Sequence, residues 1–264
     1  MVKCKDILSF LEEIAPVERK MDFDSVGLLA GEADAPVTKV LLALDITEEV
    51  IAEAESLGAE LIVSHHPLFF SLRSVNDRDY NGRRVVQLLR RGMNAICMHT
   101  NLDAADDGVN DALARALGLT DISMLHVDGV DSQGVSYGIG RIGTLKEEME
   151  LEHFLPFVKE VLGCNGIRYV SGGKKVRRIA VMGGSGGDDY PYALNCGCDT
   201  YVTADVKYHV FLEAKANGLN LLDAGHFPTE NVIIPHLYSL LSCRFSEVSF
   251  NISRRLHQTE QFFG

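Results

Sequence analysis

The feature that most constrains the fold of this chain is a regular alternation of apolar runs and amphipathic segments that starts at Lys39. Apolar runs at 39–46, 60–66 and 94–100 alternate with helical patterns at 47–58, 81–92 and 108–119. Near-continuous apolar strands separated by helices are typical of a parallel sheet with helices on both faces. We therefore expect an α/β fold with a mainly parallel sheet flanked by helices.

A change of pattern indicates a second domain. Residues 122–175 are rich in glycine and valine and contain short strand-like pieces, and the alternation of strands and helices resumes at residue 176. A chain of 264 residues is long enough for two moderate domains. We therefore place a domain boundary near residue 125.

The net charge of the chain argues against a nucleic-acid partner. Thirty-seven acidic residues against 25 basic ones give a formal charge of -12, which repels a phosphate backbone. The one basic cluster lies in "GRRVVQLLRRG" and consists of Arg83, Arg84, Arg90 and Arg91, interrupted by apolar residues. We interpret this cluster as the solvated face of an amphipathic helix.

The distribution of apolar residues and cysteines predicts a cytoplasmic protein without a membrane partner. No stretch approaches the roughly 20 apolar residues of a membrane-spanning helix. Residues 1–16 form an amphipathic helical pattern rather than a signal peptide. The six cysteines lack a paired CxxC spacing, which favours reduced thiols.

Ionisable residues follow the predicted strands. In parallel α/β sheets, binding and catalytic groups collect at the carboxyl ends of the strands. The positions at or just beyond these ends hold Asp45, His65, His66, His99, Asp103, Asp223, His226 and Glu230. We therefore expect the functional site at these strand ends.

The adjacent histidines His65 and His66 suggest a metal site. Successive residues of an extended backbone face opposite sides, and Pro67 favours an extended conformation at His66. The two rings should therefore diverge, which suits two ions better than one. Mixed imidazole and carboxylate ligands favour Zn²⁺, Fe²⁺, Mn²⁺ or Co²⁺ over Ca²⁺. The spacing leaves open either a set of buried, hydrogen-bonded polar residues or a dinuclear site built from His65, His66, Asp103, His226 and Glu230.

Six sequence blocks carry a resemblance to one known family. They are "SHHPLFF" (64–70), "HTNLDAADDGVNDALARALGL" (99–119), "YGIGRIG" (137–143), "GGSGG" (183–187), "VTADVKYH" (202–209) and "DAGHFPTE" (223–230). Together they resemble the Nif-three-like proteins, also called GTP cyclohydrolase I type 2 homologues or dinuclear metal centre proteins. One block departs from the family. Where its members commonly have Trp-Asp-Asn-Val-Gly-Leu, this chain has "FDSVGLLAG" (23–31) and no tryptophan.

The resemblance implies a dinuclear metal protein. Two divalent ions per subunit would be bound by His65, His66, Asp103, His226 and Glu230, the same five residues that the strand ends indicate. The resemblance also implies a discontinuous metal-binding α/β domain, residues 1–125 plus 226–264, and a smaller inserted α/β domain, residues 126–225. Six protomers would form a homohexameric toroid.

The chemistry implied by such a site is hydrolysis. Two divalent ions about 3.5–4 Å apart activate water near neutral pH. We expect a hydrolase acting on a nucleotide or similar small molecule, with GTP cyclohydrolase as the most concrete version. His99 and Glu230 are the expected catalytic residues, and His99 is preferred for proton transfer over Asp205, Lys207 and His209. The alternative is a non-enzymatic metal-binding scaffold or regulatory interaction protein.

The glycine-rich segment 183–187 has two interpretations. Its backbone amides, between a predicted strand and a predicted helix, would suit a phosphate. It is not a P-loop, because no Gly-Lys-Ser or Gly-Lys-Thr follows. The other interpretation is a tight turn.

Overall fold

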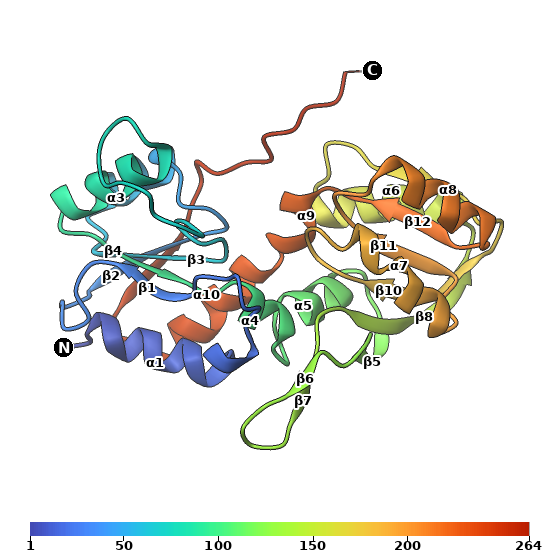
Figure 1. The fold of residues 1–264 in the computed structure, drawn as a ribbon, viewed down its shortest axis with the longest axis horizontal. Coiled ribbons are helices and arrows are strands. Elements are labelled where there is room, and N and C mark those ends of the chain that lie inside the picture. Colours follow the sequence, from blue (N-terminus) through green and yellow to red (C-terminus); the bar gives the residue numbers. More distant parts are fainter. Residues whose placement is uncertain (264) are drawn as a thin grey trace. The chain divides into compact units, whose positions relative to one another are not determined.

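The computed structural model describes residues 1–263, and the chain divides into two compact α/β units (Figure 1). The first unit comprises Met1–Leu102 and Ile234–His257, and the second comprises Asp103–Ile233 and the residues from Gln258 onward. The boundaries expected near residues 125 and 225 therefore lie instead at 102/103 and 233/234, and the second unit is not the smaller one. The reason is that α5 (Val109–Ala116) contacts strands β5 (Thr120–Met124), β8 (Arg141–Met149) and β10 (Val176–Val181) of the second sheet.

The first unit is built on a five-stranded sheet in the order β1-β4-β3-β2-β13. All pairings are parallel except that of β1 with β4. The strands are β1 (Gly27–Ala30), β2 (Lys39–Ala43), β3 (Leu61–Ser64), β4 (Asn94–Cys97) and β13 (Ser249–Ile252). The helices are α1 (Cys4–Ile14), η1 (Val17–Arg19), α2 (Glu48–Leu57), α3 (Tyr80–Arg90), α4 (Thr100–Ala104) and α10 (Ile233–Arg244). Two of the three divisions between the units fall inside α4 and α10.

Helix α2 begins and ends for local reasons that its sequence contains. The Thr47 hydroxyl accepts a hydrogen bond from the Val50 N–H at 3.3 Å and so caps the first turn. Gly58 follows the last turn with a φ of 68°, a left-handed conformation that glycine adopts without a Cβ clash. The helix expected at 47–58 is confirmed.

Helices cover both faces of the first sheet. On one face, strand residues Leu41, Ile62 and Ala95 pack in a buried cluster with Ile51 of α2 and Leu88 of α3. Helices α1 and α10 lie on the other side of the sheet (Figure 1). This layering buries the strands and leaves only their ends for polar residues.

The interpretation of the α3 arginines as a solvated face was wrong for one of them. Arg84 is buried and donates to the backbone oxygens of Ile46 at 2.8 Å and Leu68 at 2.7 Å. Arg83 instead pairs with Glu48 nearer the surface. Arg84 therefore joins the segment after β2 to the segment after β3, because it satisfies one backbone carbonyl in each.

The second unit contains a six-stranded mixed sheet in the order β5-β8-β10-β11-β12-β9, of which β10, β11 and β12 are mutually parallel. Its strands are β5 (Thr120–Met124), β8 (Arg141–Met149), β9 (Arg168–Val170), β10 (Val176–Val181), β11 (Thr200–Thr203) and β12 (Asn220–Asp223), with a small hairpin of β6 (Gly129–Val130) and β7 (Ser136–Tyr137). Its helices are α5, α6 (Leu151–Leu162), η2 (Gly187–Asp189), α7 (Tyr190–Asn195), α8 (Tyr208–Ala216) and α9 (His226–Glu230).

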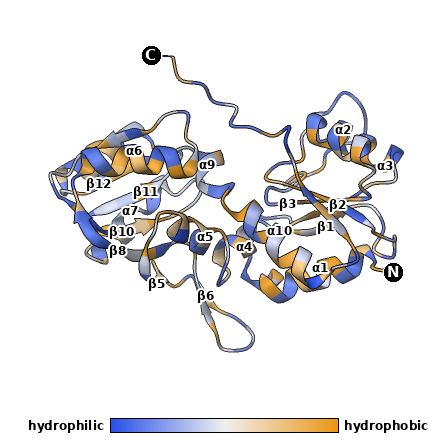
Figure 2. Cartoon of the chain, turned by 180° about the vertical axis from the view of Figure 1, so that it is seen from behind, coloured by the Kyte–Doolittle hydropathy of each residue, from blue (hydrophilic) through white to orange (hydrophobic). Residues whose placement is uncertain are grey.

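Alternate strand residues of the second sheet serve two cores. Val202 and Leu222 pack with α5 and α6, whereas their neighbours Tyr201 and Leu221 pack with α7 and α8. The two-residue period of a strand sends successive side chains to opposite faces. Figure 2 shows that α6 combines hydrophobic and hydrophilic residues, as a helix covering a sheet on one side must. The expected α/β architecture, with a sheet flanked by helices, is confirmed.

The cysteines agree with the expectation of reduced thiols. Within residues 1–263 none of the six forms a disulfide, and Cys4, Cys97, Cys164 and Cys198 are buried. Burial raises the pKa of Cys4 and of Cys164 to about 11, which keeps these thiols protonated. Within residues 1–263, no helix is long and apolar enough to cross a membrane.

Candidate functional site

Three parallel strands of the first sheet end side by side, and their carboxyl ends form one end of the sheet, called its edge below. The register pairs Ala43 with Ser64 and Ser64 with Cys97, so the parallel strands β2, β3 and β4 end in a row. Strand β1 runs the other way and begins at the same edge, because Gly27 pairs with Cys97. The segments after these parallel strands and the segment before β1 are therefore neighbours.

His65, His66 and His99 form a cluster at this edge. The ring centroids lie 5.1 Å apart for His65 and His66, 5.2 Å for His65 and His99, and 5.6 Å for His66 and His99. One ring nitrogen from each residue lies within 4.8 Å of the other two. His65 is fully buried, and the other two rings are partly buried. Three imidazoles are thus gathered in one place, as a metal site requires.

The expected divergence of the His65 and His66 rings was wrong. Strand β3 ends at Ser64, and the backbone bends at both histidines, so the alternation of an extended strand does not apply to them. The two rings are neighbours, tilted by 41°. The two rings differ in the group that accepts the hydrogen bond from Nδ1.

Each of these two rings is oriented by a hydrogen bond at Nδ1. His65 donates from Nδ1 to the carbonyl oxygen of Met98 at 2.9 Å, and His66 donates from Nδ1 to Asp45 Oδ1 at 2.7 Å. Because a carbonyl oxygen can only accept, the neutral His65 ring carries its proton on Nδ1 and its lone pair on Nε2. This arrangement orients imidazoles that bind metal through Nε2.

Asp24 orients the third ring. Its fully buried carboxylate accepts hydrogen bonds from His99 Nδ1 at 2.9 Å, from the Thr100 N–H at 3.0 Å and from the Thr100 hydroxyl at 2.5 Å. Burial alone would raise the pKa of Asp24, but these bonds outweigh it and hold the pKa well below its usual range. Sequence reasoning assigned Asp24 no role, because the strand-end rule does not select a residue that precedes an antiparallel strand.

Polar residues also follow the carboxyl ends of the parallel strands in the second sheet. Strands β10, β11 and β12 are parallel and in register, so they end side by side. Within three residues of these ends lie Gly184, Asp205 and His226. These three segments therefore meet at one edge of the second unit.

His226 lies between two carboxylates. Its Nδ1 donates to Asp205 Oδ2 at 2.8 Å, and its Nε2 lies 3.0 Å from Glu230 Oε2, four residues on in α9. Burial alone would lower the pKa of His226, but its hydrogen bonds to both carboxylates and their charges raise it to about 11. A divalent cation would compete with this proton for the same nitrogen and oxygen.

Asp205 holds His226 from an uncommon backbone position. Its φ is 53°, in the left-handed region that non-glycine residues seldom adopt. The hydrogen bond from His226 lowers the pKa of Asp205, which keeps it ionised. We therefore assign Asp205 to orienting His226, and not to the proton transfer considered from sequence.

The glycine segment 183–187 makes room for Glu230. A Cβ on Gly184 would lie 2.0 Å from Glu230 Oε1, and the φ of Gly184 is 63°. The amides of Gly183 and Gly184 donate to Asn110 Oδ1 and Thr229 Oγ1. The segment is therefore a tight turn whose first two amides serve the fold, and the phosphate interpretation is not supported.

Asp103 belongs to the same edge of the second unit. It is buried, and one of its carboxylate oxygens lies within 4.8 Å of one from Glu230. The Asn110 amide donates to the backbone oxygen of Asp103 at 3.0 Å, while its Oδ1 receives the Gly183 N–H. Asn110 thus ties Asp103 to the turn beside Glu230.

Of the other residues named from sequence, Lys207 and Asp223 have structural partners. Lys207 pairs with Asp188, and His209 is exposed at the start of α8. Asp223 is buried, pairs with Arg168 and accepts the Val206 N–H. Asp223 therefore shapes the turn after β11.

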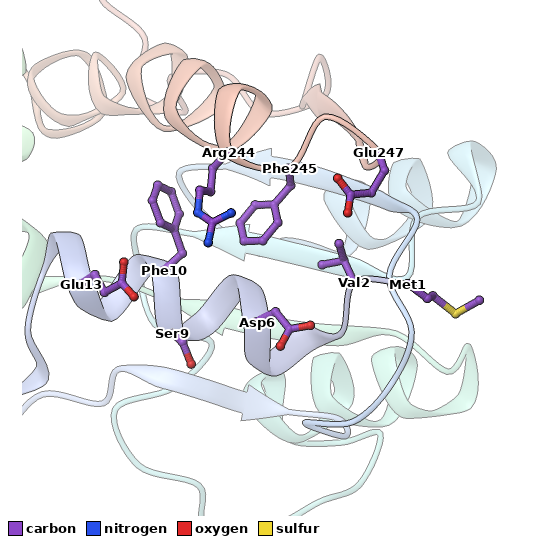
Figure 3. Close-up of a pocket in the computed structure, with 9 residues that line it drawn as sticks. All are labelled: Met1, Val2, Asp6, Ser9, Phe10, Glu13, Arg244, Phe245 and Glu247. Carbon is purple, nitrogen blue, oxygen red and sulfur yellow. The ribbon is translucent and has the colours of Figure 1, made fainter.

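A separate pocket of about 460 Å³ lies in the first unit (Figure 3). It is lined by Met1, Val2, Asp6, Ser9, Phe10, Glu13, Arg244, Phe245 and Glu247. The Arg244 guanidinium already lies over the rings of Phe10 and Phe245, and no histidine lines the pocket. We therefore place the candidate site at the histidine-bearing strand ends and not here.

The sequence matches the model of the Duf34/NIF3 (NGG1p interacting factor 3) family over residues 2–261. The chain belongs to this family. A protein of Clostridium perfringens named "GTP cyclohydrolase 1 type 2 homolog" is 38% identical over 264 residues, covering 99% of this chain and 100% of the relative. A Streptomyces coelicolor protein of the same name is 38% identical over 236 residues, covering 87% and 82%.

Solved structures of this family share the fold. The Bacillus cereus protein related to NIF3 superposes with a TM-score of 0.91 at 28% identity, covering 100% of this chain and 99% of that one. A Staphylococcus aureus hypothetical protein gives the same TM-score at 32% identity, with 99% of both chains covered. The α/β fold of both units is thus shared with these proteins over the full chain.

The residues present fit divalent first-row metals. In the first unit, imidazoles are held at Nδ1, which leaves Nε2 as the nitrogen that could bind a metal. In the second unit, the imidazole of His226 lies against the buried carboxylate of Glu230. Nitrogen and carboxylate donors in this mixture suit Zn²⁺, Fe²⁺, Mn²⁺ or Co²⁺.

Proposed function

We propose that this NIF3-family chain is a metal-dependent hydrolase of a nucleotide or similar small molecule. In this proposal two divalent cations are bound by His65, His66, Asp103, His226 and Glu230. The observation that carries the proposal is the cluster of His65, His66 and His99, whose ring nitrogens lie within 4.8 Å of one another.

Each unit supports the metal assignment by itself. In the first, the Met98 carbonyl and Asp45 fix the ring orientations of His65 and His66. In the second, Asp205 fixes His226. In metalloproteins, a histidine that binds metal through one ring nitrogen usually donates a hydrogen bond from the other, and this bond fixes the orientation of the ring.

The ions, when bound, would supply Lewis acidity and lower the pKa of water. The protein supplies the proton transfer. His99 is held at Nδ1 by Asp24, so its Nε2 is the atom that would exchange a proton with the substrate. The buried Asp24 carboxylate stabilises the protonated ring during that exchange, because its own pKa is held low. Glu230 is proposed as a ligand whose loss also abolishes turnover.

The substrate class rests on the relatives. Two of them carry the name GTP cyclohydrolase 1 type 2 homolog, which motivates GTP as the first substrate to test. In that reaction water would open the guanine imidazole ring at C8 and release that carbon as formate. We also propose a cytoplasmic location and a homohexameric ring; light scattering that gives the mass of a single chain would contradict the ring.

Elemental analysis of protein purified without an affinity tag tests the metal sites. We expect about two ions per chain, as for two-metal hydrolases, and a clear loss in His65→Ala and in Glu230→Ala. His153→Ala is the matched control, because His153 is an exposed histidine on α6. Substoichiometric metal in the wild type that neither ligand variant lowers further would contradict the proposal.

Turnover separates the enzyme from a non-enzymatic scaffold. With GTP as substrate, we expect formate release by the wild type and its loss in His99→Asn and Glu230→Gln, with circular dichroism unchanged. A metal-loaded wild type that releases no formate from GTP would reject the cyclohydrolase version. Equal turnover in the wild type and His99→Asn would reject the role of His99.

A further inference from the structure

Two exposed phenylalanines lie against each other in the first unit. Phe23 is 63% exposed and Phe70 is 55% exposed, although both are large apolar side chains. Their ring centroids are 6.1 Å apart and the rings are tilted by 53°. The two residues come from segments far apart in the sequence, one before β1 and one after β3. Such a pair costs free energy in water unless something covers it.

This pair adjoins the histidine cluster. The Phe70 ring lies 5.6 Å from the His99 ring, with an interplanar angle of 60°. His99 in turn lies 5.2 Å from His65 and 5.6 Å from His66. A molecule resting on the phenylalanines would therefore lie beside the His99 ring, which we propose transfers a proton.

Polar anchors fix the backbone beneath both rings. Asp24, the residue after Phe23, has a fully buried carboxylate that holds His99 and Thr100 and also accepts the Ser25 N–H at 2.8 Å. The Ser25 hydroxyl donates to the backbone oxygen of Phe70 at 3.1 Å. The two ring-bearing segments are thus joined to each other and to His99. A surface fixed before binding loses little entropy when a ligand arrives.

The geometry selects the kind of ligand. Two tilted rings present an open angle in which a third flat ring can stack on one face and meet the other edge-on. Neither phenylalanine offers a hydrogen bond or a charge, so the contact favours planar aromatic groups over sugars or phosphates. We propose that Phe23 and Phe70 form a stacking surface for the aromatic ring of the substrate, a purine base, beside His99. This inference rests on the proposed function, because it assigns the substrate class of the same site.

Binding to the metal-loaded protein, as purified, tests the stacking surface. Calorimetry would use guanosine 5′-monophosphate as the probe and ribose 5-phosphate as the control without a base. Loss of one stacked base commonly weakens binding by about five- to 150-fold. We expect Phe23→Leu and Phe70→Leu each to weaken the guanosine nucleotide at least fivefold and to leave ribose 5-phosphate unchanged.

A matched variant controls for the loss of an exposed ring. Phe262 is 52% exposed and belongs to the second unit, so Phe262→Leu should bind the nucleotide like the wild type. Metal content is measured on every preparation. Leucine keeps the apolar character at each position, so the variants should retain the metal of the wild type.

The outcomes separate this inference from the proposed function. The stacking surface is overturned if the wild type has full metal content but binds no nucleotide. It is also overturned if both leucine variants bind the nucleotide as tightly as the wild type. Neither result contradicts the metal site. A wild type without metal rejects the proposed function, while nucleotide binding that still needs both rings supports the surface. A lower assembly mass in the leucine variants, at unchanged affinity, would make the pair a contact between copies of the chain and overturn the inference.

Discussion

The Asp24 carboxylate accepts a hydrogen bond at 2.9 Å from the ring of His99, a residue 75 positions further along the chain. This contact joins the segment before β1 to the end of β4. It orients the ring that we propose transfers a proton, and it adjoins the aromatic pair formed by Phe23 and Phe70.

Replacing Asp24 by Asn should destabilise the first unit. The amide cannot accept all the hydrogen bonds that the carboxylate receives from His99 and Thr100. Loss of buried, charge-assisted hydrogen bonds costs about 2 kcal/mol. Urea unfolding measures this loss. Asp34→Asn is the control, because Asp34 is an exposed partner of Lys3 and Lys5 and should show little change. Equal unfolding midpoints for both variants would contradict the role of Asp24.

The same carboxylate should make stability depend on acid pH. The pKa of Asp24 is lowered in the fold, so the unfolded chain takes up its proton more readily than the folded one. The stabilisation is therefore complete above the ordinary carboxyl pKa of about 3.9 and is lost as the pH falls towards the folded value. Asp24→Asn should flatten the acid limb of the stability curve between about pH 5 and pH 2. An acid limb as steep as that of the wild type would refute this assignment.

Gly184→Ala should remove metal by displacing Glu230. The added Cβ would lie 2.0 Å from Glu230 Oε1 and would also strain a backbone with φ of 63°. Gly173→Ala separates the two effects, because Gly173 has a φ of 76° but open space around its Cβ position. Backbone strain should destabilise both variants by about 1–2 kcal/mol. Only Gly184→Ala should lower metal content, and a normal metal content in that variant would argue against Glu230 as a ligand.

Asp205→Asn should weaken metal binding without unfolding the second unit. Asn tolerates the left-handed backbone found at position 205, but its amide cannot hold His226 as the ionised carboxylate does. Loss of such an orienting group typically reduces metal affinity about 10–100-fold. Competition against a chelator measures the affinity. Wild-type affinity in Asp205→Asn would show that His226 does not need this partner.

Arg84→Ala should loosen the segment that leads to Phe70. It removes the donors to the backbone oxygens of Ile46 and Leu68, which are buried with it. We expect a loss of about 2 kcal/mol in unfolding free energy. Arg83→Ala, which breaks only the pair with Glu48, should change stability little. Equal unfolding free energies for the two variants would contradict the stabilising role of buried Arg84.

Much of this molecule follows from local sequence. Apolar runs and amphipathic periods predicted the α/β class and the alternating strands and helices of residues 39–119, and Thr47 and Gly58 predicted both ends of α2. The strand-end rule also selected His65, His66 and His226, because parallel strands bring their carboxyl ends to one edge whatever the details of packing. These features depend on residues close in the chain or on a general property of parallel sheets.

Other features were decided only by the tertiary structure. Asp24 accepts a hydrogen bond from His99, 75 residues further along the chain, because the antiparallel strand β1 begins beside the end of β4. Glu230 occupies the space that a side chain at position 184 would fill. The bend after Ser64 places His65 and His66 side by side, contrary to the extended pattern. The unit division at residues 102/103, in place of 125, depends on which sheet α5 packs against. Such contacts join segments that are far apart in the sequence. They depend on strand register and on helix packing, which local sequence patterns do not determine.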